Sequence, residues 1–158
     1  MGTICNVLTT TPDETAALAA RLAERVQIGD TLLLSGPIGA GKSVFARSLI
    51  QSLLTRTGQN EDVPSPTFTL VQRYQAGNLP IVHADLYRLK NRHELDDIGL
   101  LDDIGTALTL IEWPELLPEW IRGEALSLTI AGDGQQRHIS LSGAHSWAQR
   151  LSGFGDAA

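Results

Sequence analysis

The sequence is short of cysteine and of long apolar runs, and each shortage excludes a class of protein. Cys5 is the single cysteine, so the chain cannot form an internal disulfide, and no Cys/His cluster suggests a zinc site. No stretch approaches the roughly 20 apolar residues of a membrane helix, and the first residues lack the pattern of a secretory signal. We therefore expect a cytoplasmic protein with no membrane partner.

Lysine is also scarce, which disfavours proteins that bind nucleic acid tightly on their own. The formal net charge is -6, and the chain has only two lysines, Lys42 and Lys90. Neutralisation of phosphate dominates the affinity for nucleic acid, and this requires a basic face. We expect contact with RNA only inside a complex, where a local arginine patch could touch it.

The patterns that are present predict one α/β domain. Hydrophobic residues make up 42% of 158 residues, enough for one core. Apolar runs at residues 31–35 and 107–111 are typical of buried parallel strands. We expect a P-loop NTPase-like three-layer sandwich, whose mixed sheet has a parallel core and antiparallel edge strands. Its single domain is expected over residues 1–142, followed by a helical or loose C-terminal tail over 143–158.

Local signals predict the other elements. Thr11 and Glu14 form a capping box around Pro12, which predicts a helix that continues to about Gln27. A second helix is expected from about Lys42 to Arg56. The remaining expected elements are strands at 4–8, 67–75 and 80–87, helical pieces at 93–98, near Asp102-Asp103 and at 115–121, and a hairpin that joins 125–131 to 136–141 through Asp133-Gly134.

One motif carries a specific chemistry: Gly36-Pro37-Ile38-Gly39-Ala40-Gly41-Lys42-Ser43. Glycines let backbone N–H groups approach phosphate oxygens, and the helix that follows adds the positive end of its dipole. The Lys42 ammonium fits between β- and γ-phosphates, and the Ser43 hydroxyl fits magnesium. A chance glycine turn is the alternative, but the loop follows a predicted buried strand and opens a predicted helix. We expect ATP and Mg²⁺ as ligands, with nucleotide contacts at Thr11, Gly36, Pro37, Ile38, Gly39, Ala40, Gly41, Lys42, Ser43 and Val44.

Two acids follow predicted strands and are candidates for the magnesium site. Asp85 ends residues 80–84, and Glu112 ends residues 108–111. A solvated strand end or an ion pair with Arg88 is the alternative for Asp85, and a turn cap is the alternative for Glu112. Because a phosphate loop needs a carboxylate at the end of a neighbouring strand, at least one is expected at the metal.

Three further residues near these motifs have open interpretations. Thr67 could reach the γ-phosphate or a magnesium-bound water, or its segment could be an ordinary loop with Phe68 in the core. His83 fits a hydrogen-bonded structural histidine better than a base. Trp113 fits a packing residue better than a contact to nucleotide.

Four ordered motifs together resemble those of the TsaE (YjeE) family. They span residues 36–43, 65–71, 83–89 and 111–115, and the resemblance runs from about Thr11 to the final hairpin. It implies a weak ATPase of tRNA threonylcarbamoyladenosine biosynthesis that associates with TsaD and TsaB. TsaD transfers the threonylcarbamoyl group, so contact with tRNA is indirect. ATP binding and hydrolysis are implied to reset that complex between turnovers.

The resemblance also implies residue roles. Ser43 and Glu112 match the magnesium positions, although the family is expected to carry Thr where this chain has Ser43. Asp85 matches an acid important for hydrolysis, which we interpret as an orienting residue rather than a base, with a structural role also open. The expected catalytic residues are Lys42, Thr67, Asp85 and Glu112.

Two other functions remain open. A small-molecule kinase needs an arginine-bearing lid, which the group Arg88, Lys90 and Arg92 could mimic. A non-enzymatic GTP switch has less support, since no Asn-Lys-x-Asp guanine-reading segment is present.

Overall fold

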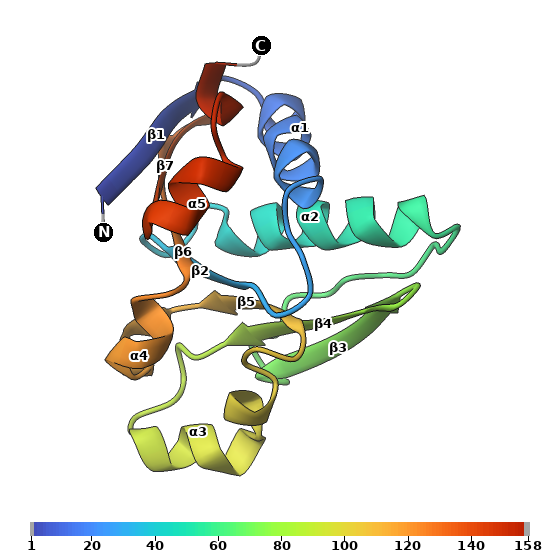
Figure 1. Cartoon of the computed structure of the whole chain (residues 1–158), viewed down its shortest axis with the longest axis vertical. Coiled ribbons are helices and arrows are strands. Elements are labelled where there is room, and N and C mark those ends of the chain that lie inside the picture. The colour runs from blue at the N-terminus through green and yellow to red at the C-terminus, as the bar shows by residue number, and fades with distance from the viewer. Residues whose placement is uncertain (1, 157–158) are drawn as a thin grey trace.

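The computed structural model describes residues 2–156. It consists of a mixed sheet between two layers of helices (Figure 1). The strands are β1 Gly2–Thr9, β2 Thr31–Ser35, β3 Val71–Ala76, β4 Leu79–Asp85, β5 Leu108–Glu112, β6 Leu126–Asp133 and β7 Gln136–Gly143. The helices are α1 Pro12–Ala23, α2 Lys42–Arg56, α3 Arg92–Ile98, α4 Glu119–Arg122 and α5 His145–Arg150, with 3₁₀ turns η1 Leu100–Asp102, η2 Pro114–Leu116 and η3 Phe154–Asp156.

The strand order confirms the predicted parallel core and antiparallel edges. The seven strands run β1-β7-β6-β2-β5-β4-β3. β2 pairs in parallel with both β5 and β6, and β4 pairs in parallel with β5. The pairs β1–β7, β6–β7 and β3–β4 are antiparallel. The phosphate-loop strand β2 therefore lies at the centre, with β5 on one side and β6 on the other.

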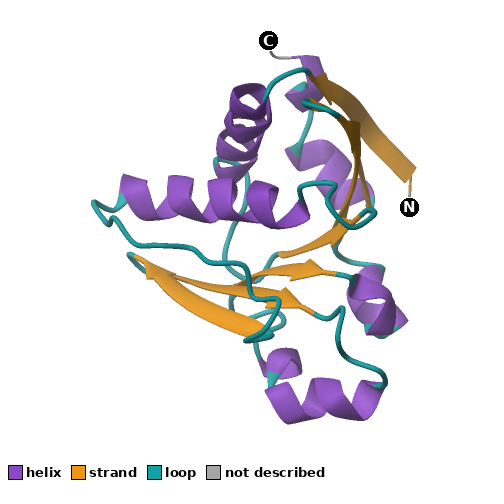
Figure 2. Cartoon of the chain, turned by 180° about the vertical axis from the view of Figure 1, so that it is seen from behind, coloured by secondary structure: helices purple, strands orange, loops and turns teal. Residues whose placement is uncertain are grey.

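Alternating side chains of the central strands divide the core into two halves. Leu32 and Leu34 join a cluster with α1, α2 and the C-terminal segment, whereas Leu33 joins a cluster with α3 and α4. Seen from behind, α2 lies along one face of the sheet while α3 and α4 cover the other (Figure 2). Because side chains of a strand alternate between faces, an all-apolar strand such as β2 belongs in a sheet that is covered on both sides.

The first helix begins at the predicted capping box. The Thr11 hydroxyl accepts a hydrogen bond from the backbone N–H of Glu14 at 3.1 Å, and Glu14 Oε1 accepts from the N–H of Thr10 at 2.7 Å. Hydrogen bonds from the backbone and side chain of Thr10 lower the pKa of the Glu14 carboxyl. The helix ends at Ala23, earlier than predicted, because the N–H groups of Glu24 and Arg25 donate to carbonyls three residues back instead of four.

Two strand predictions extended too far. Residues 67–70 form a turn, not the start of a strand, because Leu70 has a φ of +70° and its N–H donates to the carbonyl of Pro66. Phe68 is 82% exposed at this turn, so its placement in the core is wrong. β4 ends at Asp85 instead of residue 87, because the carboxylate of Asp85 accepts the N–H of Tyr87 in a turn.

The helix predicted at residues 115–121 is divided. The short turn η2 comes first, and α4 begins only at Glu119. Pro118 lies between them in an extended conformation at φ -60° and ψ 153°. Proline has no backbone N–H to continue a helical ladder, so it is suited to the start of α4 and not to the interior of a longer helix.

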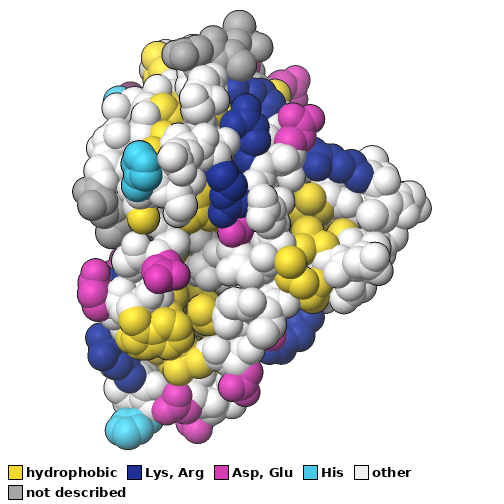
Figure 3. Space-filling view, viewed as in Figure 1, with side chains coloured by type: hydrophobic (Ala, Val, Ile, Leu, Met, Phe, Trp, Pro, Cys, Tyr) yellow, Lys and Arg dark blue, Asp and Glu magenta, His cyan; other side chains and the backbone are white. Residues whose placement is uncertain are grey.

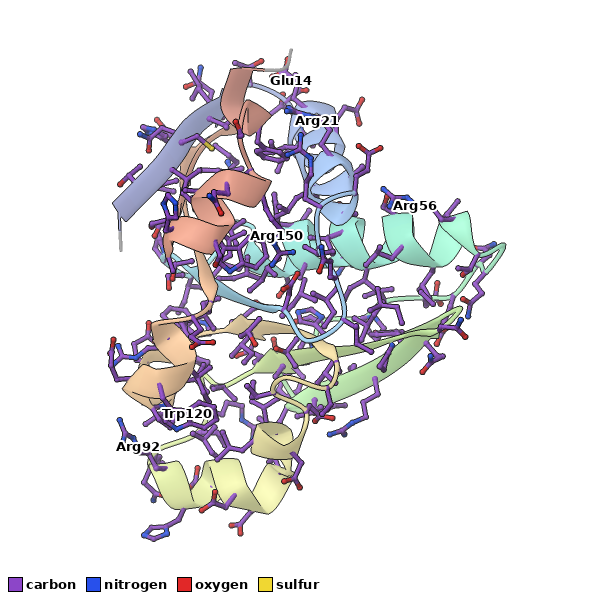
Figure 4. The ribbon with its side chains drawn as sticks, in the orientation of Figure 1. Glu14, Arg21, Arg56, Arg92, Trp120 and Arg150 are labelled. Atoms are coloured by element: carbon purple, nitrogen blue, oxygen red, sulfur yellow. The ribbon has the colours of Figure 1, made fainter. Side chains whose placement is uncertain are left out.

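The C-terminal segment packs against α1 and the sheet. Trp147 is buried, and its indole N–H donates to the carbonyl of Glu124 at 3.2 Å. Arg150 donates to both carboxylate oxygens of Asp30 at 2.7 and 2.8 Å. Figure 3 shows Lys and Arg side chains gathered along the seam between α1 and α5, and Figure 4 places Arg21 and Arg150 there. Across residues 2–156, the helices are all too short or too polar to span a membrane.

Candidate functional site

The glycine-rich loop leaves β2 and crosses close to β6 before α2 begins. Ser35, the last residue of β2, is paired with Thr129 of β6. Gly36 follows with a φ of +149°, and a Cβ at this position would lie 2.2 Å from the carbonyl oxygen of Ile130. Any larger residue would push β2 away from β6, so the close approach of the two strands requires glycine here.

Lys42 is held inside the loop that precedes it. Its side chain is 5% exposed, and Nζ donates to the carbonyls of Gly36 at 2.7 Å and Pro37 at 2.9 Å. The ammonium also lies 4.2 Å from the centre of the Trp113 ring. Burial lowers the pKa of Lys42, and the neighbouring carboxylates, Glu112 first, oppose that shift. The charge therefore sits among neutral carbonyls in a place where phosphate oxygens would be stronger partners.

Ser43 and Glu112 meet directly beside Lys42. Ser43 Oγ donates to Glu112 Oε1 at 2.8 Å and lies 3.0 Å from Oε2. Glu112 is 2% exposed at the end of β5. The parallel pairing of β2 with β5 brings this carboxylate to the same sheet edge as the loop. The alternative interpretation of Glu112 was a cap for the following turn, but its carboxylate is hydrogen-bonded to the side chain of Ser43.

His83 provides the second partner of Glu112. Its Nε2 lies 2.6 Å from Glu112 Oε2, and both side chains are almost fully buried. A carboxylate only accepts, so Nε2 carries the proton in this hydrogen bond. Nδ1 is buried and has no hydrogen-bond partner within residues 2–156. This contact agrees with the prediction of a hydrogen-bonded structural histidine.

The side chains at this edge fit magnesium. A serine hydroxyl and one carboxylate are hard oxygen ligands, and Mg²⁺ in nucleotide sites takes its other ligands from phosphates and water. No cluster of three or more His, Cys, Asp or Glu suited to a metal occurs in the described part of the chain. With two oxygen ligands from the protein, Ser43 and Glu112 fit a metal that is shared with a phosphate ligand.

A chain of hydroxyls links Asp85 to Ser43. Thr67 Oγ1 donates to Asp85 Oδ2 at 3.2 Å and lies 2.8 Å from Ser65 Oγ. Ser65 Oγ in turn lies 3.2 Å from Ser43 Oγ. Asp85 Oδ1 accepts the N–H of Tyr87 at 2.9 Å. Asp85 and Glu112 are direct neighbours in the register of β4 and β5, so both acids face one site.

Arg88, the alternative partner of Asp85, is placed elsewhere. Its guanidinium lies 5.6 Å from the centre of the Phe68 ring. Asp85 forms no ion pair with it among residues 2–156. Arg88, Lys90 and Arg92 are all absent from the lining of the cavity next to the loop.

That cavity has a volume of about 430 Å³ and brings most of the predicted residues together. Its lining consists of Ile38, Gly39, Gly41, Lys42, Ser43, Val44, Thr67, Asp85, Tyr87, Glu112, Trp113 and Arg137. Four of the predicted nucleotide contacts do not line it: Thr11, Gly36, Pro37 and Ala40. Thr11 is exposed and caps α1 with its hydroxyl.

Two aromatic residues close one side of the cavity. The rings of Tyr87 and Trp113 have centroids 4.8 Å apart and are tilted by 47°. Trp113 has a φ of +59°, a conformation that is uncommon for a residue other than glycine. Trp113 thus packs, as predicted, and also lines the cavity. Strained backbone of this kind is concentrated at functional sites.

Fold and loop together define an α/β protein of the P-loop NTPase-like class. The model of one family, described as threonylcarbamoyl adenosine biosynthesis protein TsaE, matches residues 9–139. The chain belongs to the TsaE family.

Individual relatives agree with this assignment. The tRNA threonylcarbamoyladenosine biosynthesis protein TsaE of Rickettsia conorii is 37% identical over 130 residues, which cover 82% of this chain and 73% of the relative. Its counterpart in Bacillus subtilis is 37% identical over 137 residues, or 85% of this chain and 82% of the relative. A crystal structure of Bacillus subtilis YdiB superimposes with a TM-score of 0.74 at 30% identity, and covers 96% of this chain and 94% of that one.

The site contains three residues for which no role was predicted from the sequence: Ser65, Tyr87 and Arg137. Ser65 lies two residues before Thr67, in the motif at residues 65–71. Its hydroxyl is a polar group of the same kind as that of Thr67 and could have marked it as a site residue. Arg137 offered no local signal, because it comes from the last hairpin of the sheet, far along the chain from the loop. The order β7-β6-β2 brings it to the loop.

Proposed function

We propose that this chain binds ATP with magnesium and hydrolyses it slowly, as an accessory ATPase in the threonylcarbamoyladenosine modification of tRNA. The observation that carries the proposal is the contact between Ser43 and Glu112 beside Lys42. A hydroxyl at the start of a helix, a buried carboxylate on the adjacent parallel strand and a loop lysine are the parts that phosphoryl transfer uses. Membership of the TsaE family supports the pathway.

Each side chain has a defined task in this proposal. Lys42 exchanges the carbonyls of Gly36 and Pro37 for oxygens of the β- and γ-phosphates. Ser43 and Glu112 hold the metal, with Glu112 oriented by His83. The metal, when bound, screens the charge of the terminal phosphates and makes them better electrophiles.

Asp85 and Thr67 orient the water that attacks the terminal phosphate. Both line the cavity on the side of the carboxylates, and they are hydrogen-bonded to each other. The transition state of phosphoryl transfer is loose, so positioning of the nucleophile contributes more than removal of its proton. The two hydrogen bonds from Thr67 and Tyr87 hold the carboxylate of Asp85 in one orientation.

The proposed partners are TsaD and TsaB, with tRNA reached through their complex. The support is the family relationship, together with the acidic charge of the chain, which argues against independent binding of tRNA. The kinase alternative loses its main argument, since its candidate lid residues Arg88, Lys90 and Arg92 do not line the cavity.

The test is magnesium-dependent ATP hydrolysis by the purified chain, alone and with TsaD, TsaB and tRNA. We expect slow turnover that rises in the complex and is lost in Lys42→Ala. The matched control is Lys90→Ala, since the only other lysine lies outside the cavity. Turnover that is indifferent to the complex would contradict the accessory role, and label transferred to a metabolite instead of water would indicate a kinase.

A further inference from the structure

The side chain of Arg137, a residue of β7, extends across the β6–β7 hairpin toward the phosphate loop. A Cβ placed on Gly41, the residue before Lys42, would stand 3.4 Å from Arg137 Nε. Arg137 also lines the cavity that contains Lys42 and Ser43. It is therefore a second cationic side chain of this cavity, contributed by an element unrelated to the loop motif.

A glycine on the neighbouring strand leaves room for the Arg137 side chain to extend along the hairpin. Gly132 of β6 is the cross-strand partner of Arg137. A Cβ on Gly132 would stand 2.5 Å from Arg137 Cδ and 2.6 Å from its Nη1. Any side chain at position 132 would displace the guanidinium, so the glycine keeps open the path along which Arg137 extends.

The guanidinium is anchored at one nitrogen and unengaged at the others. Nη1 donates to the carbonyls of Gly134 at 2.7 Å and Gln136 at 2.6 Å. Within residues 2–156, Nε and Nη2 have no hydrogen-bond acceptor and no carboxylate pairs with Arg137. Three N–H donors and a full positive charge are thus held in place beside a cavity suited to phosphates.

Sheet topology places Arg137 on the opposite side of the loop from the acids. The loop follows β2, whose neighbours are β5 and β6. Glu112 and Asp85 come from β5 and β4, on the first side, and Arg137 reaches the loop over β6, on the second. A triphosphate whose terminal end lies at the carboxylates therefore has its nucleoside end toward Arg137.

We infer that Arg137 binds the nucleotide at its nucleoside-proximal α-phosphate, and so contributes equally to the affinity for ATP and for ADP. The inference rests on the proposed nucleotide-binding function. Arg137 takes no part in hydrolysis, because its position is on the side away from Asp85 and Glu112. It holds the nucleoside end while Lys42 and the metal residues act on the terminal phosphates.

The test compares the dissociation constants of ATP and ADP, measured by calorimetry with Mg²⁺, for the full chain and for Arg137→Ala. A lost charge-assisted contact predicts a fall in affinity of about tenfold or more for both nucleotides. Arg137→Lys keeps the charge but not the fork of donors, and should recover part of the loss. Arg92→Ala is the matched control, since Arg92 is exposed at the start of α3, away from the cavity (Figure 4).

Each outcome has a distinct meaning. Unchanged affinity in Arg137→Ala would overturn the inference, and so would a loss for ATP alone, which would place the guanidinium at the terminal phosphate. A wild-type chain that binds neither nucleotide would instead refute the proposed function. Thermal unfolding of each variant checks its fold, and if Arg137→Ala does not fold, Arg137→Lys and Arg137→Gln carry the comparison.

Discussion

The buried contact between His83 and Glu112 leads to a strong prediction about stability. Both side chains are at most 2% exposed, and Nε2 lies 2.6 Å from Oε2. His83→Ala removes a hydrogen bond to a charged group, worth about 1.5–3 kcal/mol, and also leaves a cavity and a carboxylate with one donor fewer. The expected loss in the free energy of unfolding is about 3–5 kcal/mol, the range measured when one partner of a buried pair is removed.

The assay is chemical denaturation at neutral pH, supported by thermal unfolding. For a chain of this size each kcal/mol shifts the midpoint by about 2–4 °C, so His83→Ala should unfold about 6–20 °C lower. His83→Gln carries a donor of similar reach and should lose only about 1 kcal/mol. The exposed His93 supplies the control, because His93→Ala should stay within about 0.5 kcal/mol of the parent.

A double-mutant cycle separates the contact from the loss of bulk. Comparison of His83→Ala, Glu112→Ala and the combined variant should give a coupling free energy of about 1–3 kcal/mol. If the coupling were within about 0.5 kcal/mol of zero, the two residues would not depend on each other. The assignment of His83 as the residue that orients Glu112 would then be wrong.

Three further changes have expected outcomes. Gly36→Ala should destabilise the fold by about 1–3 kcal/mol in urea unfolding, because its Cβ meets the carbonyl of Ile130 at 2.2 Å, whereas Gly58→Ala has no such neighbour and should cost less. Asp85→Asn should slow ATP hydrolysis by about 10- to 100-fold with little change in the dissociation constant of ATP; an equal loss of both would reject the orienting role. The lowered pKa of Lys42 means that the unfolded chain holds its proton up to about pH 10.5 while the folded chain releases it earlier. Stability relative to Lys42→Met should therefore rise with pH in the alkaline range below 10.5, and a difference that does not change with pH would contradict this.

The sequence was most informative where local pattern and burial agree. The apolar run of β2 and the helix that opens at Lys42 were predicted with their observed bounds, since an all-apolar strand and a glycine-rich loop are local features. The meeting of Asp85 and Glu112 followed from a topological rule, because parallel strands end at the same edge of a sheet.

The remainder depends on contacts that the sequence does not encode locally. The prediction of a strand from residue 67 was wrong because Leu70 takes a left-handed conformation that its residue type disfavours. Backbone hydrogen bonds of Leu70 with Pro66 and Asp85 stabilise this turn, and they are visible only in the structure. The position of Arg137 at the loop depends on the strand order β7-β6-β2 and on the space at Gly132. Neither feature has a periodicity or a motif from which it could be inferred.

The placement of buried charge connects the fold with the proposed function. Within residues 2–156 the buried side chains of Asp, Glu, His, Lys and Arg residues are Lys42, His83, Asp85 and Glu112, and all four stand at one edge of the sheet. Buried charges are costly to keep, and replacement of such groups by apolar residues is often neutral or stabilising. Stability alone therefore does not explain why they are gathered at one place. Two carboxylates facing one ammonium would also repel a polyphosphate, unless a divalent cation entered with it. The same arrangement, which is costly to the fold, would favour the proposed binding of a nucleotide together with its metal over binding of the nucleotide alone.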